Sequence, residues 1–158
     1  EVEIAFVIGQ KAKNIKENEA KNFIFGFCLV NDLTEREWQF DKLGQWVKGK
    51  SADTFGPIGP YLVTPDEISD VQNLNMSLDV NGKRMQTGNT NKMIFKINFI
   101  VSYLSKFMTL MPGDIITTGT PPGVGMGRKP AVYLKDGDKI KLSIDNLGEQ
   151  FHEVKQEV

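Results

Sequence analysis

The chain has 158 residues, of which 40% are hydrophobic and 25% are charged, and its formal net charge is −1. That length and composition suit one globular domain that can bury its own hydrophobic core. Without a basic excess, and without any run near the roughly 18 apolar residues of a membrane span, we expect neither a nucleic acid nor a membrane as a partner.

The first third of the chain predicts two strands separated by a polar loop. Residues 1–9 indicate a strand, 18–22 a short helix, and 23–31 a second strand that is apolar on both faces and therefore covered on both sides. Capping-box spacing predicts a helix over 34–40, because Thr34 stands three residues before a glutamate. Glycines and prolines then make 41–60 irregular.

The middle of the chain predicts a β-hairpin. A short strand at 61–64 and a turn at 65–68 come first. Residues 74–80 alternate between apolar and polar, which is typical of a half-buried strand. Asn81-Gly82 is a strong hairpin signal, so we expect the chain to return as a strand over 83–87.

The last part of the chain predicts the one long helix, at 90–108, where apolar residues keep helical spacing. A short strand at 115–118, a Gly/Pro loop at 119–130 and strands at 131–134 and 139–145 follow. Many short strands and a single long helix together predict a β-rich α+β fold.

Two residue types that often carry chemistry occur only once. Cys28 lies in an apolar run, so we expect a buried hydrophobe; a lone cysteine forms no internal disulfide, which agrees with a cytoplasmic protein. His152 follows the last predicted strand, where a surface position is the expectation. No Ser-His-Asp triad and no Cys/His zinc cluster can be assembled from them.

Glu1-Val2-Glu3 opens the first predicted strand. Residues i and i+2 of a strand project from one face, so the two carboxylates would lie roughly 7 Å apart along it. Such a pair could bind a hard divalent cation, which prefers oxygen ligands. An exposed acidic face at a strand end is the common alternative.

Polar residues after the second strand are candidates for a site, each with an ordinary alternative. Asp32 stands at a strand-to-helix corner, which suits an active-site group or a turn residue. Arg36 and Gln39 share a helical face; the arginine could bind a substrate carboxylate or pair with nearby acidic residues in water. Lys50 could stabilise a substrate oxyanion or be a solvated loop charge.

The glycine-rich loop at 119–127 does not predict a phosphate site. A phosphate loop needs a following helix and usually a Lys-Ser/Thr pair, whereas prolines and a strand follow here. Its glycines suit a tight loop whose backbone N–H groups approach a small ligand, and Thr120 is its only hydroxyl.

These segments resemble the fumarylacetoacetate hydrolase family in collinear order over nearly the whole chain. The resemblance implies a mixed β-roll or β-sandwich, a homodimer, and a single catalytic domain over residues 1–158. The amino-acid sequence of these segments is most similar to that of the subgroup acting on 2,4-diketo-3-deoxy sugar acids. Some members of this subgroup are named ureidoglycolate lyases. The matching stretches are EVEIAFVIG, GFCLVNDLTEREWQ, KSADTFGPIGPYLVT, VNGKRMQTGNTNKMIF and PGDIITTGTPPGVGMG.

The resemblance also implies a site and a reaction. A divalent metal, Mg²⁺ or Mn²⁺ with Ca²⁺ as a further candidate, would be bound by three carboxylates, those of Glu1, Glu3 and Asp32. The substrate would contact Arg36, Gln39 and Thr120, while Lys50 would act as the catalytic residue. The expected reaction cleaves a C–C bond of a 2,4-diketo acid, giving pyruvate and a second carboxylic acid.

Other functions stay open at this point. Related enzymes decarboxylate oxaloacetate-like acids or isomerise hydroxymuconate-type dienes, and a catalytically silent domain could keep the fold and a metal or carboxylate site. Family members commonly take a water-activating His-Glu pair from a segment before the E-x-E strand, and His152 does not match it. We therefore expect that an upstream lid segment is missing from this chain.

Overall fold

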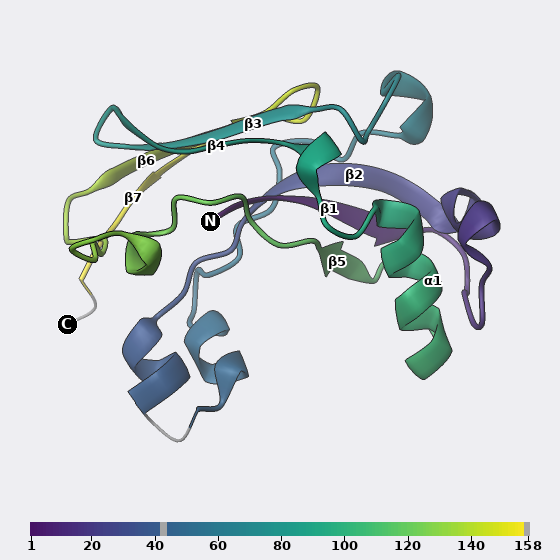
Figure 1. Ribbon diagram of the computed structural model, residues 1–158, viewed down its shortest axis with the longest axis horizontal. Coiled ribbons are helices and arrows are strands. Elements are labelled where there is room, and N and C mark those ends of the chain that lie inside the picture. The colour runs from purple at the N-terminus through teal and green to yellow at the C-terminus, as the bar shows by residue number, and fades with distance from the viewer. Residues whose placement is uncertain (42–43, 157–158) are drawn as a thin grey trace.

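The computed structural model describes residues 1–41 and 44–156, which form two antiparallel sheets and one main helix. The first sheet has the strand order β2-β1-β5, and the second has the order β4-β3-β6-β7. Figure 1 shows the second sheet lying over the first. The strands are β1 (Val2–Ile8), β2 (Ile24–Asn31), β3 (Asn75–Val80), β4 (Lys83–Asn89), β5 (Ile115–Thr117), β6 (Lys139–Ile144) and β7 (Gly148–Glu153).

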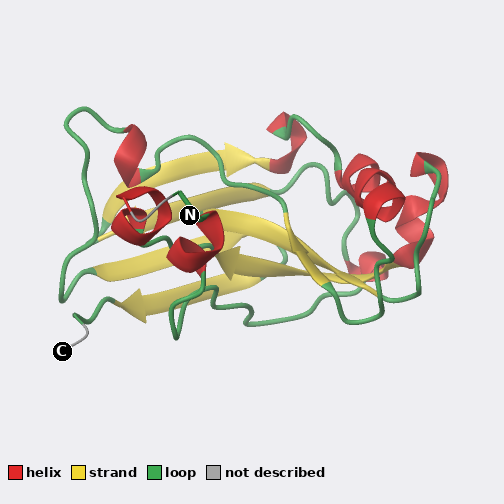
Figure 2. Cartoon of the chain, turned by 90° about the horizontal axis from the view of Figure 1, so that it is seen from below, coloured by secondary structure: helices red, strands yellow, loops and turns green. Residues whose placement is uncertain are grey.

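Helical segments lie at the ends and below the sheets. The α-helix α1 (Ile97–Phe107) packs against η1 at one end of the molecule (Figure 2). No helix among the described residues is long and apolar enough to span a membrane. The short helical segments are η1 (Glu17–Phe23), η2 (Glu37–Asp41), η3 (Trp46–Lys50), η4 (Pro65–Glu67), η5 (Thr90–Lys92) and η6 (Gly125–Gly127).

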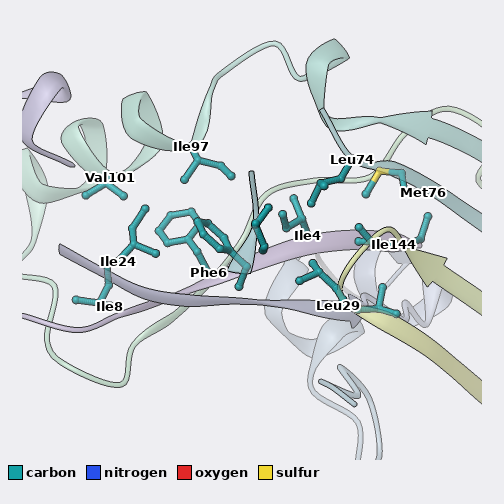
Figure 3. Packing of buried hydrophobic residues seen from close by; sticks show 14 of the residues in the cluster. Ile4, Phe6, Ile8, Ile24, Leu29, Leu74, Met76, Ile97, Val101 and Ile144 are labelled. Carbon is teal, nitrogen blue, oxygen red and sulfur yellow. The ribbon is translucent and has the colours of Figure 1, made fainter. Parts of the chain in front are cut away.

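The hydrophobic core lies between the two sheets and extends under α1. Ile4 and Phe6 of β1 are buried, and the core continues through Met76 and Ile144 of the second sheet (Figure 3). β1 is buried along almost its whole length, as a central strand with neighbours on both sides should be. The α+β, β-rich fold that the sequence predicts is confirmed.

Several predicted elements agree with the structure. β1 and β2 lie where the apolar runs place them, and Cys28 is buried. Asn81 and Gly82 both have positive φ, as a two-residue hairpin turn between β3 and β4 requires. The helix predicted at 18–22 is the 3-10 segment η1.

Three predicted elements are shorter or absent. The long helix begins at Ile97 instead of residue 90, because the Gln72 side chain accepts a hydrogen bond from the Ile97 N–H (2.8 Å) and Lys96 is extended. Residues 61–64 form only a single bridge, at Val63, and 131–134 form no strand.

Two further predictions, those for residues 34–40 and for His152, are corrected by the structure. The helix predicted over 34–40 is the short π-helical segment η2. The buried hydroxyl of Thr34 has no hydrogen-bond partner in the part of the chain that the structure describes, so no capping box is seen there. Part of the segment predicted to be irregular, residues 42–43, lies outside the described residues. His152 does not lie after the last strand, as expected, but is half-buried in β7, an edge strand whose polar sequence does not indicate a strand.

Candidate active site

Three carboxylates converge where β1 begins and β2 ends. Glu1 precedes β1, Glu3 lies within it, and Asp32 follows the last residue of β2. Antiparallel pairing brings the two strand ends together, and the Asp32 N–H donates to the Glu1 carbonyl oxygen (2.9 Å). One oxygen from each carboxylate lies within 4.8 Å of the other two. We call these three residues the carboxylate cluster.

Two cations border the carboxylate cluster. Lys50 Nζ lies 2.6 Å from Asp32 Oδ2 and 3.2 Å from Glu1 Oε2. Arg36 forms an ion pair with Glu1 and donates from a second guanidinium nitrogen to Gln39 Oε1 (2.7 Å). The Lys50 and Arg36 side chains are 27% and 21% exposed, so neither cation is an isolated charge in solvent.

Close packing of η2 against η3 brings Lys50 to the carboxylate cluster. The Glu35 N–H donates to the Gly49 carbonyl oxygen (2.8 Å). A Cβ on Gly49 would lie only 2.6 Å from Gln39 Cβ, so a side chain at this position would push the two segments apart. Gly49 therefore allows Lys50 and Arg36 to approach the same carboxylate, that of Glu1.

Glu3 is the most perturbed carboxylate of the site. Its side chain is buried, and Oε2 accepts a hydrogen bond from the Gly119 N–H (2.9 Å). Burial raises the pKa of Glu3 to about 7, and the nearby Asp32 and Glu1 charges act in the same direction. A bound cation would oppose both causes, so this position suits a metal ligand.

The raised pKa predicts how stability depends on pH in the absence of a divalent cation. The pKa of Glu3 in the folded chain lies above its ordinary value of 4.5, so the folded chain binds this proton more tightly than the unfolded chain does. Folding is therefore favoured below pH 4.5, and this contribution is lost as the pH rises through about 7. Thermal unfolding in a chelator should show the protein losing stability relative to Glu3→Gln between pH 4.5 and 7.5; parallel profiles would contradict the assignment.

The loop after β5 closes another side of the cluster. Thr120 Oγ1 donates to the Val2 carbonyl oxygen (2.9 Å) and accepts from Gln86 Nε2 (2.7 Å). Gly119 has a positive φ and so turns its N–H toward Glu3. The loop thus meets β1 at the stretch that carries the two glutamates.

Buried polar atoms without a protein partner also border the site. Gln39 is fully buried, and its Oε1 is bound by Arg36, but its Nε2 has no hydrogen-bond partner among the described residues. Asn31 is fully buried as well; its Oδ1 accepts from the Glu1 amino nitrogen (3.1 Å), while its Nδ2 has none. An unpaired buried donor costs free energy, so Gln39 Nε2 is a group to which a ligand oxygen could bind.

The structure brings six of the predicted site residues together: Glu1, Glu3, Asp32, Arg36, Gln39 and Lys50. Thr120 reaches them through its contact with Val2. Arg36 was expected to bind substrate or pair with its helical neighbours; its recorded ion pair is with Glu1. Gln86 and Gly119 were missed. The alternation along β3 could have indicated Gln86, because it pairs with the buried Leu78 and must therefore face the core.

His152 lies outside this set. Its Nε2 contacts Gln150 Oε1 (2.9 Å) within β7, and burial lowers its pKa. A shallow hollow on the second sheet is lined by Lys141, Phe151 and His152, among others, and shares no residue with the carboxylate cluster.

Residues 1–155 match the family model described as fumarylacetoacetate (FAA) hydrolase C-terminal. A Burkholderia multivorans protein, provisionally described as a hydrolase, is 57% identical over 151 residues, which are 95% of this chain and 54% of that protein. The chain thus spans about half the length of the curated relatives it matches.

Solved structures share the fold. A fumarylacetoacetate hydrolase from Exiguobacterium antarcticum is 40% identical with a TM-score of 0.95, covering 99% of this chain and 56% of that one. A maleylpyruvate hydrolase from Sphingobium sp. SYK-6, in complex with manganese(II) and pyruvate, is 35% identical with a TM-score of 0.87, covering 100% and 54%. A 2-hydroxyhepta-2,4-diene-1,7-dioate isomerase from Mycobacterium marinum is 36% identical with a TM-score of 0.86, covering 98% and 57%.

Proposed function

Because the chain belongs to the fumarylacetoacetate hydrolase family, we propose that it carries the site of a metal-dependent hydrolase acting on C–C bonds. The substrate would be a 2,4-diketo acid of the acylpyruvate type, cleaved with one water molecule to pyruvate and a second carboxylic acid. The observation that carries this proposal is the convergence of Glu1, Glu3 and Asp32 to within 4.8 Å. The manganese and pyruvate bound by the Sphingobium hydrolase support it.

The donor set fits a hard divalent cation. Three carboxylates offer oxygen ligands of the kind that Mg²⁺ and Mn²⁺ prefer, and Ca²⁺ accepts them as well. Glu3, buried with its pKa raised, gains most from a nearby positive charge. In this proposal Glu1, Glu3 and Asp32 bind the metal, with Mg²⁺ or Mn²⁺ as the resident ion.

The remaining predicted residues are proposed to bind and orient the substrate. Arg36 and Gln39 Nε2 would donate to substrate oxygens. Gln39 Oε1 accepts from Arg36, which already fixes the side chain, while Nε2 has no partner among the described residues. Because the Thr120 hydroxyl already donates to the Val2 carbonyl oxygen, the Thr120 backbone N–H would be the donor that holds the substrate carboxylate beside β1. Orienting groups of this kind reduce the entropy that must be lost in the transition state.

Lys50 is proposed as the catalytic residue. The metal, when bound, would act as a Lewis acid toward the keto acid. Lys50 Nζ already lies against two carboxylates of the cluster, so it could also stabilise negative charge that develops on the substrate as the C–C bond breaks. His152, whose contact is with Gln150 in β7, receives no role in activating water.

A side-by-side assay tests the reaction. The protein with Mg²⁺ or Mn²⁺ is expected to release pyruvate from an acylpyruvate faster than it decarboxylates oxaloacetate or isomerises a 2-hydroxydienoate. Isomerisation of a 2-hydroxydienoate is the second candidate reaction, because the Mycobacterium marinum isomerase has a similar fold. Preferred turnover of the diene would replace hydrolysis by isomerisation. Binding of Mn²⁺ and oxalate without turnover of any of the three would indicate a catalytically silent binding domain.

We also propose that the protein is a cytoplasmic homodimer, as the family resemblance implies. Support comes from the aromatic side chains that α1 exposes, where Tyr103 and Phe107 are 48% and 65% exposed. Analytical ultracentrifugation should give twice the 17.7 kDa chain mass. A monomer at micromolar concentration would contradict the dimer without affecting the site.

A further inference from the structure

Within residues 1–41 and 44–156, the first half of β1 has no strand neighbour on the side of β5. β5 pairs only with Ala5–Val7, so the backbone groups nearer the carboxylate cluster need other partners. Side chains supply them. Thr118 Oγ1 donates to the Ile4 carbonyl oxygen (2.7 Å), and Thr120 Oγ1 donates to that of Val2 (2.9 Å).

The last of these partners is Gln86, which comes from β4 of the other sheet. Its Oε1 accepts a hydrogen bond from the Val2 N–H (3.1 Å). Its Nε2 donates to Thr120 Oγ1 (2.7 Å) and to the Pro121 carbonyl oxygen (2.8 Å). Gln86 is only 2% exposed, so both ends of its amide are used inside the protein.

Other contacts hold the same loop on β4. Arg128 donates from its guanidinium to the Met85 carbonyl oxygen (2.8 Å) and to that of Gly123 (3.2 Å). A Cβ on Gly123 would overlap the Met85 carbonyl oxygen, so the loop backbone lies directly against the strand. β4 belongs to the upper layer in Figure 1 and β1 to the lower one, and Gln86 connects them at the carboxylate cluster.

We propose that Gln86 is a positioning residue that fixes the strand of Glu1 and Glu3 relative to the loop of Thr120. Val2 stands between the two glutamates, so a shift of its backbone would move both carboxylates. The same amide holds the hydroxyl of Thr120, and the neighbouring Gly119 N–H binds Glu3. Gln86 therefore contacts both the strand of the proposed metal ligands and the substrate-binding loop. This inference rests on the proposed function.

Replacement by an apolar side chain of similar length tests the role. Gln86→Met should weaken Mn²⁺ binding to the intact protein roughly 10-fold by calorimetry, as losses of residues that orient metal ligands typically do. At saturating Mn²⁺ it should raise KM for the acylpyruvate more than it lowers kcat, since Lys50 does not contact Gln86 and keeps its place while the substrate-binding loop moves. Gln86→Glu keeps the acceptor for the Val2 N–H but puts a buried carboxylate oxygen against the Pro121 carbonyl oxygen, so it should weaken Mn²⁺ binding at least as much as Gln86→Met.

The matched control is Gln150→Met. Gln150 is similarly buried, and its Nε2 also donates to backbone carbonyl oxygens, but these belong to Leu29, Pro57 and Gly59. This variant should lose stability in thermal unfolding while keeping its Mn²⁺ affinity. Equal weakening in both glutamine variants would overturn the positioning role, because general loosening would then explain it.

Two outcomes separate this inference from the proposed function. If Glu3→Gln abolishes Mn²⁺ binding while Gln86→Met and Gln86→Glu leave affinity and KM unchanged, only the positioning role is overturned. If Glu3→Gln leaves Mn²⁺ binding intact, the proposed metal site is overturned. The positioning role of Gln86 at that site is then overturned as well.

Discussion

Glu3→Gln is expected to abolish divalent-metal binding and to stabilise the metal-free protein. The amide keeps the shape of the side chain but removes a negative charge that burial disfavours. Metal affinity should fall by roughly 100-fold or more, since losing a residue that binds the metal directly costs at least as much affinity as losing a residue that orients it. Calorimetry with Mn²⁺ measures this loss, and unchanged affinity would disprove the ligand assignment.

The gain in stability should accompany the loss of binding. At pH 7.5, where Glu3 is largely ionised, the substitution should raise the unfolding free energy by up to about 3 kcal/mol, because each tenfold change in proton affinity is worth ~1.4 kcal/mol. Glu149→Gln is the control: that carboxylate pairs with Lys141 on the surface and is 47% exposed, so its loss should change neither property much. A fall in the melting temperature of Glu3→Gln would contradict the proposed electrostatics.

Lys50→Ala is expected to lower turnover far more than metal affinity. Removal of a group that stabilises developing negative charge typically costs roughly 100- to 1000-fold in kcat. Metal affinity should hold or increase slightly, because Lys50 is a cation within 3.2 Å of two of the proposed ligands. Pyruvate release under saturating Mn²⁺, with Mn²⁺ calorimetry on the same sample, measures both effects.

Lys141→Ala is the matched control for Lys50. Lys141 also forms an ion pair, with Glu149 at 2.9 Å, but lies on the second sheet away from the carboxylate cluster. Its loss should leave kcat unchanged. An unaltered kcat in Lys50→Ala would remove that residue from the catalytic proposal, whereas a parallel loss of metal affinity and kcat would make it a structural support of the cluster.

The proposed metal site explains why the fold contains a group of carboxylates that lowers its stability when no cation is bound. Glu3 is buried beside two other acidic groups, an arrangement that costs folding free energy without a cation. Proteins commonly give up stability in this way where a function requires it. Arg36 and Lys50 offset part of the repulsion through Glu1 and Asp32, but no cationic side chain is recorded within ion-pair distance of Glu3 among the described residues.

The sequence by itself determined the features that depend on local chemistry. Apolar runs predict β1 and β2, and Asn81-Gly82 predicts the hairpin, because strand burial and turn conformation follow from neighbouring residues. The E-x-E spacing placed Glu1 and Glu3 on one face of a strand for the same reason. Their selection as metal ligands, together with Asp32, came from the family resemblance and not from spacing alone.

Only the tertiary structure decided the features that depend on distant residues. The start of α1 is set by Gln72, 25 positions before Ile97, so helical periodicity placed it too early. The ion pair of Arg36 with Glu1 spans 35 positions, and the contact of Gln86 with Val2 spans 84. Such contacts satisfy buried polar groups whose partners are fixed by packing, and no local pattern encodes which partner that is.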